Sequence, residues 1–243
     1  MRGAGHTMAK SELEFTGERV VPGKTPDTIY KEHMDRYVFA GGLTAGRDVL
    51  DVACGTGYGS GYMAETGARS VTGVDVSMLA VRYARDWYGD HGGTGFVCAD
   101  GCGLPFADGS FDAVVSFETL EHIRPYRRFL LDCRRVLREH GCLIVSTPNR
   151  RIFSPEAARP PNPFHVREFW AEEFRRLIGG LFADVTLFGQ CDVNLSDNAV
   201  DREHGVGEFR DNESVSSAYM IAVARKRANC RRRARRTISR SSS

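Results

Sequence analysis

The sequence predicts a doubly wound α/β domain on a mostly parallel sheet, and three observations carry that prediction. From Asp48 onward, short apolar runs alternate with stretches of helical spacing. The runs are continuously apolar, which is typical of strands buried on both faces of a parallel sheet. A glycine-rich turn joins the first run to the first of these helical stretches. This order indicates a seven-stranded sheet whose last two strands form a C-terminal antiparallel hairpin.

Each element follows from its local pattern. A helix is expected from about Asp27 to Leu43, because apolar and aromatic residues recur there at spacings of three and four. The apolar run 49–53 predicts the first buried strand. The long loop 191–214 would then connect the last two strands as a hairpin. The remaining expected elements are helix 58–66, strand 71–76, helix 78–88, strands 95–98 and 111–117, helix 126–137, strand 142–146, helix 169–178, and strands 184–188 and 217–223.

Charge and composition divide the chain into three parts. Residues 1–24 lack a clear period and are interpreted as a flexible segment, residues 25–225 as the domain, and residues 226–243 as a basic tail. From Arg225 to Ser243 there are nine basic and no acidic residues, whereas the rest carries 24 basic and 31 acidic ones. Such a terminal run is typically solvated and disordered, although it could also bind RNA phosphates or an acidic partner.

Composition excludes several classes of protein. Apolar residues make up 42% and charged residues 26%, as in a globular protein. No apolar stretch approaches the ~20 residues of a membrane span, and the N-terminus lacks a secretory hydrophobic block, so we expect a cytoplasmic protein without membrane contact. The seven cysteines are scattered without a C-x-x-C pair, which argues against a disulfide framework or a thiolate zinc site. The pattern leaves a monomer and a homodimer open.

The glycine-rich turn, D-V-A-C-G-T-G-Y-G at residues 51–59, suits close approach of a ligand to the backbone. Taken alone, it would also suit NAD or a simple tight turn. The glycines are spaced G-x-G-x-G, with Ser60 in place of the last glycine of G-x-G-x-x-G. Asp51 precedes the turn and favours a cationic ligand over a pyrophosphate. We therefore expect Gly55, Thr56 and Gly57 to belong to a cofactor site.

Two further carboxylates follow successive strands. Asp75 ends the second strand beside Val76, where a carboxylate can accept hydrogen bonds from both hydroxyls of a ribose. Its alternative role is to cap the next helix, a role that Ser77 could fill instead. Asp100, followed by Gly101, comes after the third strand and can accept a bond from an exocyclic adenine amine.

The spacing of these carboxylates, with L-P-F at 104–106 and S-F-D-A-V-V at 110–115, resembles the class I S-adenosylmethionine (SAM)-dependent methyltransferases, which have a Rossmann-like fold. The resemblance covers about residues 47–149. It implies that Asp51 and Gly55 lie near the methionine end of the cofactor and Phe117 near the sulfonium. The expected cofactor-binding set is Asp51, Gly55, Thr56, Gly57, Asp75, Val76, Asp100, Gly101 and Phe117.

The acceptor is expected at the end of the fourth strand, where the sequence reads F-E-T-L-E-H at 117–122. Methyl transfer gains most from positioning, but a hydroxyl acceptor also needs its proton removed, and His122 is the candidate base. The alternative is that Glu121 and His122 only cap and pack the next helix. His165 lies after a proline-rich stretch, 154–163, that we expect to cross the strand ends as a lid. The predicted catalytic set is His122, His165 and Glu118.

Glu118, Glu121, His122 and His165 also resemble the E-x-x-E-H plus distant histidine set of small-RNA 2′-O-methyltransferases, in which the four residues bind a divalent metal. Oxygen and nitrogen ligands suit Mg²⁺ or Mn²⁺. The aromatic and basic surroundings of an RNA site are not evident here, so only these four residues carry over. Convergent acids and histidines also occur in metal-free acid–base sites.

A second resemblance lies in F-T-G-E-R-V-V-P at 15–22 and H-M-D-R-Y at 33–37, with T-P-N-R at 147–150 and N-P-F-H at 162–165. These motifs are similar to bacterial methyltransferases of glycan and natural-product pathways. The likeness implies that Tyr30, His33, Arg36 and Tyr37 form a helix closing the cofactor pocket. Arg36 would then pair with the cofactor carboxylate. The alternative is an ordinary amphipathic helix with surface charges.

Three functions are compatible with these patterns. The first is an O- or N-methyltransferase of a small molecule, with a sugar or sugar-bearing natural product, as in antibiotic biosynthesis, as the leading acceptor. The second is an RNA 2′-O-methyltransferase that uses the Glu/His cluster and the basic tail. The third is a non-catalytic cofactor-binding module, against which the filled cofactor positions and the histidine-bearing pocket argue.

Overall fold

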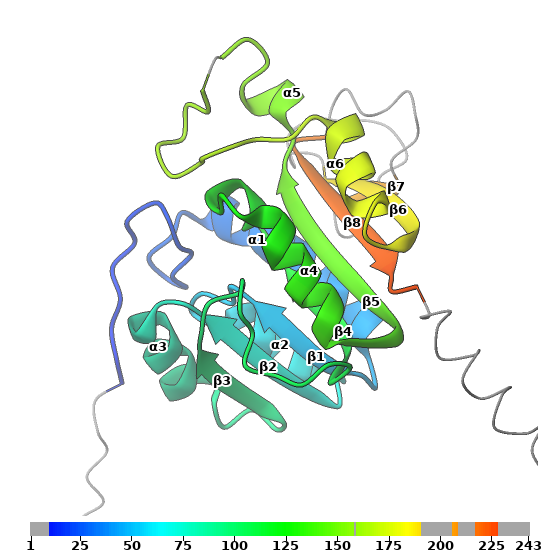
Figure 1. Ribbon diagram of the computed structural model, residues 1–243. Helices are drawn as coiled ribbons and strands as arrows, with labels where there is room; N and C mark the ends of the chain where they lie inside the picture. Colours follow the sequence, from blue (N-terminus) through cyan, green and yellow to red (C-terminus); the bar gives the residue numbers. More distant parts are fainter. Residues whose placement is uncertain (1–9, 158, 191–205, 209–216, 228–243) are drawn as a thin grey trace, which may run out of the picture.

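The computed structural model describes residues 10–157, 159–190, 206–208 and 217–227. Its eight strands form a single sheet in the order β3-β2-β1-β4-β5-β8-β6-β7 (Figure 1). The strands are β1 (Asp48–Val52), β2 (Ser70–Asp75), β3 (Thr94–Cys98), β4 (Phe111–Ser116), β5 (Leu137–Pro148), β6 (Ala183–Gln190), β7 (Val206–Glu208) and β8 (Tyr219–Arg225). The helices are α1 (Asp27–Thr44), α2 (Tyr58–Glu65), α3 (Met78–Tyr88), the 3₁₀ helix η1 (Leu120–His122), α4 (Tyr126–Val136), α5 (Arg150–Phe153) and α6 (Ala171–Gly179).

Strand pairing confirms the predicted fold class. Strands β1 to β5 pair in parallel, whereas β8 inserts antiparallel between β5 and β6. The expected seven strands and the antiparallel C-terminal pair are therefore present. The three-residue strand β7 adds an edge that the sequence pattern did not predict, and it pairs antiparallel with β6.

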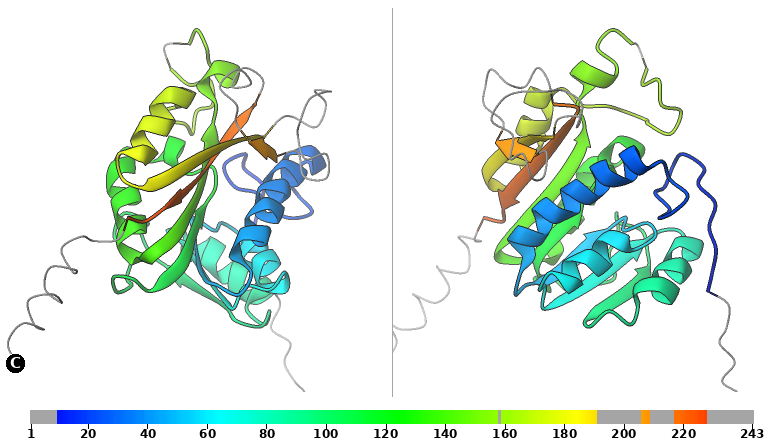
Figure 2. Two further views of the ribbon diagram at one scale, coloured as in Figure 1. Left: turned by 90° about the vertical axis from the view of Figure 1, so that its right-hand side faces the viewer. Right: turned by 180° about the vertical axis from the view of Figure 1, so that it is seen from behind.

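Helices cover both faces of the sheet, as a doubly wound fold requires. Helices α1, α2 and α3 lie on one face, seen from behind in Figure 2, and α4 and α6 lie on the other. Strand residues alternate between the two cores: Leu50 and Val114 pack with α4, whereas Val49 and Val115 pack with α1 and α2. Both faces are buried, and this explains why the strands read as continuous apolar runs.

The boundaries differ from expectation mainly around β5. This strand begins at Leu137 and ends at Pro148, well beyond the expected 142–146. The helix expected from Phe169 begins at Ala171, because the carbonyl of Phe169 accepts a hydrogen bond from Arg150 N–H (3.0 Å) and Phe169 bridges in parallel to Asn149. These pairings hold the residues before and after the lid segment together at the end of β5.

The chain ends are described only in part. Residues 10–24 contain no helix or strand, yet Val20 and Val21 are buried. The predicted extent of the flexible segment, the limits of the domain and the disorder of the tail remain predictions, and residues 1–9 and 228–243 lie outside the described part. Within the described residues the five cysteines are free, and no helix is long and apolar enough to cross a bilayer.

Candidate active site

Two adjoining cavities open at the carboxyl ends of the parallel strands, where ligands of such sheets bind. Their volumes are about 370 and 340 Å³. The first reaches toward the end of β3, and the second toward α1 and the N-terminal segment. They share six lining residues: Ala53, Asp75, Val76, Thr119, His122 and Ile123. The two cavities therefore form one continuous groove.

Asp75 lies where the two cavities meet, and its carboxylate is held by backbone donors. Oδ2 accepts a hydrogen bond from Gly55 N–H (2.9 Å), and Oδ1 accepts one from Ser77 N–H (2.8 Å). Ser77 itself caps α3 by accepting from Ala80 N–H. Because each carboxylate oxygen has a second lone pair, Asp75 can still accept two hydroxyl donors from a ligand in the groove.

The first cavity holds the residues expected to face adenine. Asp100 and Gly101 line it after β3, and Asp100 Oδ1 accepts a hydrogen bond from Cys102 N–H (2.8 Å). A Cβ on Gly101 would stand 2.7 Å from Phe129, so only glycine fits between the loop and α4. The exposed side chain of Val76 provides apolar surface at the cavity wall.

The second cavity holds the residues expected around the methionine end. Gly55, Tyr37 and Phe117 line it, and the rings of Tyr37 and Phe117 meet edge to face with centroids 5.0 Å apart. Asp51 lies directly behind Tyr37, accepting hydrogen bonds from the hydroxyls of Ser60 (2.6 Å) and Tyr37 (3.3 Å). Burial raises the pKa of Asp51 to about 7.

Four of the expected cofactor residues line neither of these two cavities: Asp51, Thr56, Gly57 and Arg36. The Thr56 hydroxyl donates to the Val20 carbonyl (3.0 Å). Gly57 adopts a φ of +83°, and a Cβ there would stand 2.6 Å from Ala84 Cβ, so it provides close packing of α2 against α3. Arg36 is fully buried and donates through Nη1 to Gln190 Oε1 (2.6 Å).

His122 lines both cavities, and its hydrogen bonding fixes its tautomer. Nδ1 lies 2.9 Å from the Phe164 carbonyl oxygen, which can only accept, so Nδ1 carries the proton. Nε2 therefore presents a lone pair. Burial lowers the pKa of His122, which keeps the imidazole neutral near pH 7. A neutral imidazole with a free Nε2 is the form that a general base requires.

Glu121 is buried beside His122 but is only partly hydrogen-bonded. Oε2 accepts from the Thr147 hydroxyl (2.9 Å), whereas Oε1 has no hydrogen-bond partner and lies 3.8 Å from His122 Nε2. Burial, and then the nearby charge of Glu118, raise the pKa of Glu121 well above its ordinary value. Two acceptor atoms that face each other in this way leave room for a proton or a cation between them.

Glu118 stands at the mouth of the second cavity with strained backbone. Its φ is +49°, a left-handed conformation that is uncommon for residues other than glycine. Ser146 supports this conformation, because its Oγ accepts from Glu118 N–H (3.1 Å) and donates to Glu118 Oε1 (2.6 Å). The strain places Glu118 at the groove directly after β4.

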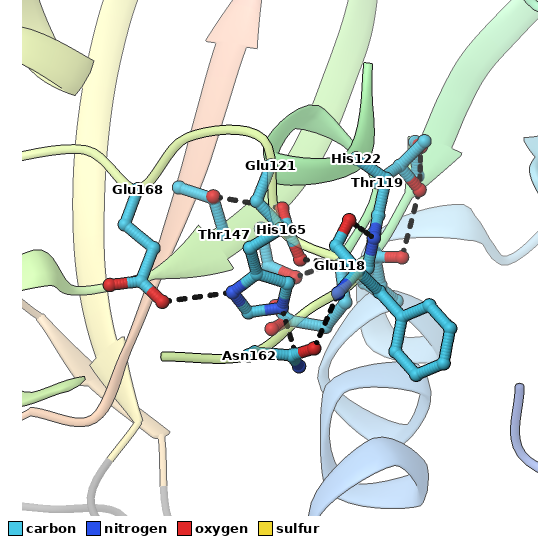
Figure 3. Close-up of polar contacts among 12 residues, drawn as sticks. Glu118, Thr119, Glu121, His122, Thr147, Asn162, His165 and Glu168 are labelled. Carbon is cyan, nitrogen blue, oxygen red and sulfur yellow. Dashed lines mark hydrogen bonds and ion pairs between the residues drawn. The ribbon is translucent and has the colours of Figure 1, made fainter. Parts of the chain in front are cut away.

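His165 meets this cluster from the lid, as Figure 3 shows. Its Nδ1 lies 2.8 Å from Glu168 Oε1, and its Nε2 lies 3.0 Å from Asn162 Nδ2. Glu168 in turn accepts a hydrogen bond from the Ser154 hydroxyl. The rings of His122 and His165 meet edge to face with centroids 4.9 Å apart. The lid and the end of β4 therefore form one polar cluster.

Three of the four expected metal ligands converge. Ligand atoms of Glu121, His122 and His165 lie within 4.8 Å of one another, and this group does not include Glu118. The unpaired Glu121 Oε1 and the His122 lone pair suit a divalent ion. Asn162 already donates to Nε2 of His165, so that histidine would have to exchange a partner to bind metal. The fit to a metal ion is therefore partial.

Sequence reasoning missed several polar residues of the site. Thr147, Asn162 and Glu168 hold the Glu/His cluster, and Glu18 and Arg19 line the second cavity. Asn162 lies in the N-P-F-H motif at 162–165, whereas Glu168 lies outside the motifs described above. A carboxylate three residues after His165 was the available signal, since this spacing lets the two side chains meet.

Comparison with known proteins agrees with this geometry. Residues 50–145 match the family model described as a methyltransferase domain. A probable SAM-dependent methyltransferase of Mycolicibacterium smegmatis is 39% identical over 173 residues, covering 69% of this chain and 64% of that protein. The probable SAM-dependent methyltransferase Rv3030 of Mycobacterium tuberculosis is 39% identical over 185 residues, covering 75% of this chain and 66% of that protein. The chain thus spans slightly less than two thirds of each relative.

A solved structure has the same fold. A SAM-dependent methyltransferase of Thermotoga maritima, described as a possible histamine N-methyltransferase, superposes with a TM-score of 0.64 at 18% identity, covering 83% of this chain and 94% of that one. The fold is therefore that of this solved SAM-dependent methyltransferase, and residues 50–145 match the methyltransferase domain model. The particular reaction is not determined by the fold, because one fold carries many chemistries.

Proposed function

We propose that this protein transfers the methyl group of SAM to a hydroxyl group of a small-molecule acceptor. One observation carries the proposal: His122, neutral and with a free Nε2, lines both halves of a groove whose carboxylates suit adenosine. The relatives named as probable SAM-dependent methyltransferases support the cofactor. A base at this position favours oxygen as the nucleophile, because a hydroxyl must lose its proton as the methyl group arrives.

The residues of this chain would act mainly by positioning. SAM supplies an electrophilic methyl group on its sulfonium. Asp75, Asp100 and Gly101 would hold the adenosine, and the Phe117 ring would flank the sulfonium. His122 would accept the acceptor's proton at Nε2 while Phe164 fixes the ring through Nδ1. The unpartnered Glu121 Oε1, which lies 3.8 Å from Nε2, would then be the acceptor for a hydrogen bond from the protonated imidazole.

A sugar or sugar-bearing natural product, as in antibiotic biosynthesis, is the acceptor class that we propose. Glu18 and Glu118 both line the second cavity near His122. Carboxylates at the rim can each accept hydrogen bonds from the neighbouring hydroxyls of a polyol and so orient one hydroxyl toward the base. The expected domain, residues 25–225, would carry this activity together with the preceding segment that supplies Glu18, as a monomer or a homodimer.

A divalent ion, Mg²⁺ or Mn²⁺, is a second element of the proposal. Glu121, His122 and His165 would hold it, with Glu118 nearby, and it would polarise the acceptor oxygen. The unpaired Glu121 Oε1 favours this arrangement, and the bond from Asn162 to His165 opposes it. A chelator distinguishes the metal-assisted mechanism from the metal-free one with His122 as base. Only the metal-assisted enzyme should lose methyl-transfer activity with EDTA and regain it with added Mg²⁺.

The decisive test is methyl transfer from labelled SAM to matched pairs of acceptors, each a glycoside and its deoxy analogue lacking a single hydroxyl. We expect label in the glycoside of at least one pair and none in its deoxy partner. SAM binding is measured in parallel by calorimetry. Amine-bearing acceptors are assayed beside them, and label found only in these would show that the acceptor group is an amine and not a hydroxyl. Absence of SAM binding would refute the methyltransferase proposal itself.

A further inference from the structure

Residues 10–25, here called the N-terminal strap, run from beside α3 to the start of α1 (Figure 1), and Glu18, Arg19 and Val20 of this strap line the second cavity. At the α3 side, Ser11 donates to Asp86 Oδ2 through N–H (3.0 Å) and Oγ (2.6 Å), and Trp87 Nε1 donates to the Ser11 carbonyl (3.2 Å). At the α1 side, Val20 and Val21 are buried, and the Val20 carbonyl accepts from Thr56. The strap is therefore held on both sides of the glycine-rich turn.

Arg19 is the strap residue that places a positive charge in the second cavity. Its Cγ and Cδ lie 3.6 and 3.9 Å from the point where a Cβ on Gly55 would stand. The arginine stem therefore lies over the glycine-rich turn, and Arg19 lines the cavity together with Gly55 and Asp75. Within the described part of the chain, the Arg19 guanidinium forms neither an ion pair nor a hydrogen bond. It is half-buried, so an anion in this cavity would meet an unpaired cation.

Arg36, which the second sequence resemblance assigned to the cofactor carboxylate, is directed elsewhere. Its guanidinium donates to Gln190 and lies 4.4 Å from the centroid of the Tyr219 ring, between α1 and the strands β6 and β8. It lines neither of the two cavities. Between these two arginines, only Arg19 lines one of the two cavities.

We propose that Arg19 binds the carboxylate at the methionine end of SAM and that the N-terminal strap covers this end of the cofactor. The inference rests on the proposed function, because it requires SAM in the groove. It adds a contact from a segment outside residues 50–145, the part that matches the methyltransferase family model. The contact recognises the amino-acid part of the cofactor and is independent of the acceptor.

The test compares two ligands that differ in a single carboxylate: SAM and decarboxylated SAM. Arg19→Met removes the charge and keeps an apolar side chain over Gly55. We expect calorimetry to show about tenfold weaker SAM binding by this variant, the usual value of a charge-assisted hydrogen bond in a partly exposed site, and unchanged binding of decarboxylated SAM. Arg19→Lys should recover part of the SAM affinity.

Lys24→Gln is the matched control, because Lys24 is a cation of the same strap that pairs with Glu14 (2.6 Å) and lines neither cavity. It should bind both ligands like the wild type. Equal weakening of both ligands by Arg19→Met would show that Arg19 only holds the strap. Selective loss of SAM affinity in Arg36→Gln but not in Arg19→Met would return the role to Arg36. Either result overturns the inference, whereas a wild type that binds neither ligand refutes the proposed function first.

Discussion

The expected cofactor residues and the Glu/His cluster, here called the cofactor half and the acceptor half of the site, are built in different ways. On the cofactor half, the carboxylates and glycines come from residues 51–101, and each lies at or just after the carboxyl end of a parallel strand, at the same edge of the sheet. On the acceptor half, the polar cluster joins three separate segments: the end of β4, the end of β5 and the lid. The first half is organised by sheet topology, and the second depends on tertiary packing of a loop.

The carboxyl groups of the two halves also differ in how completely they are hydrogen-bonded. Asp75 is held by backbone N–H groups of its own loops, so both of its oxygens are partnered before any ligand arrives. Glu121 depends on Thr147 for one oxygen and leaves the other buried without a partner. An unpaired buried acceptor costs about 1–3 kcal/mol. The acceptor half therefore carries an unsatisfied group beside His122, the proposed base.

The largest effect is expected from replacing His122, the proposed base. His122→Asn keeps a side-chain N–H that can donate to the Phe164 carbonyl but loses the Nε2 lone pair. We expect turnover to fall by about 10²–10⁴, the usual contribution of a general base, with SAM affinity unchanged. Single-turnover methyl transfer and calorimetry measure the two quantities.

His140→Asn is the matched control for that experiment. His140 is exposed and lies near the start of β5, at the opposite end of this strand from the groove. Its φ of +65° is one that asparagine tolerates well. This variant should retain wild-type turnover. If His122→Asn also retains it, the cluster is structural, and positioning alone drives the transfer.

The cofactor half should respond in the opposite way, through affinity. Asp75→Ala removes two charge-assisted acceptors, each worth about 1.5–3 kcal/mol, and also leaves the N–H groups of Gly55 and Ser77 without their partner. We expect SAM affinity to fall at least about tenfold in calorimetry. Asp90→Ala, at an exposed position after α3, serves as the control for folding and charge. Wild-type affinity in a folded Asp75→Ala protein would remove the ribose assignment.

Much of the fold was predictable because its signals are local. Continuous apolar runs identified the strands, and the order of strands and helices fixed the sheet class. The start of α6 was not predictable, since Phe169 looks helical in sequence but is held extended by its pairing with Asn149 and Arg150. Long-range backbone pairing overrides such a pattern.

In the candidate site, too, the residues with local sequence signals could be predicted, and those placed by tertiary packing could not. The carboxylates at strand ends could be placed in sequence because parallel topology brings them to one edge. By contrast, nothing in the spacing distinguishes Arg36 from Arg19, and only the packing shows that Arg36 lies against Tyr219 and Arg19 over Gly55. The partners of His165 likewise depend on how the lid folds back.

The protonation of Asp51 offers a finer comparison between free and bound states. Burial raises its pKa from 3.8 to about 7, with Ser60, Tyr37 and Asp75 nearby. Because the folded pKa lies above the ordinary value, this group favours folding at low pH, and that contribution is lost as pH rises from about 4 through 7. A cationic ligand would stabilise the ionised form and lower this pKa.

SAM affinity should therefore increase as pH rises through 7, by about tenfold if ligand binding lowers the pKa of Asp51 by a single unit. Calorimetry between pH 5.5 and 8.5 measures this slope. Asp51→Asn cannot ionise and should show a flatter profile. An identical slope in both proteins would assign the titration to another group, such as a histidine.

The smallest effect is expected outside both halves, from cutting the chain after Arg227. Strand β8 ends at Arg225, but Lys226 is still anchored, because its N–H donates to the Gly141 carbonyl of β5 (2.9 Å) and its Nζ to the Arg135 carbonyl of α4 (3.2 Å). The cut keeps these contacts and removes the arginine run 231–236. SAM affinity, transfer to small acceptors and the unfolding temperature should match those of the full chain.

Charge alone gives only non-specific nucleic-acid affinity that weakens as salt rises. RNA affinity of the full chain, measured at two salt concentrations, should therefore fall at the higher one, and bound RNA should not be methylated. Methylation of RNA that disappears with the cut would instead make RNA the acceptor and assign the Glu/His cluster to its 2′-hydroxyl.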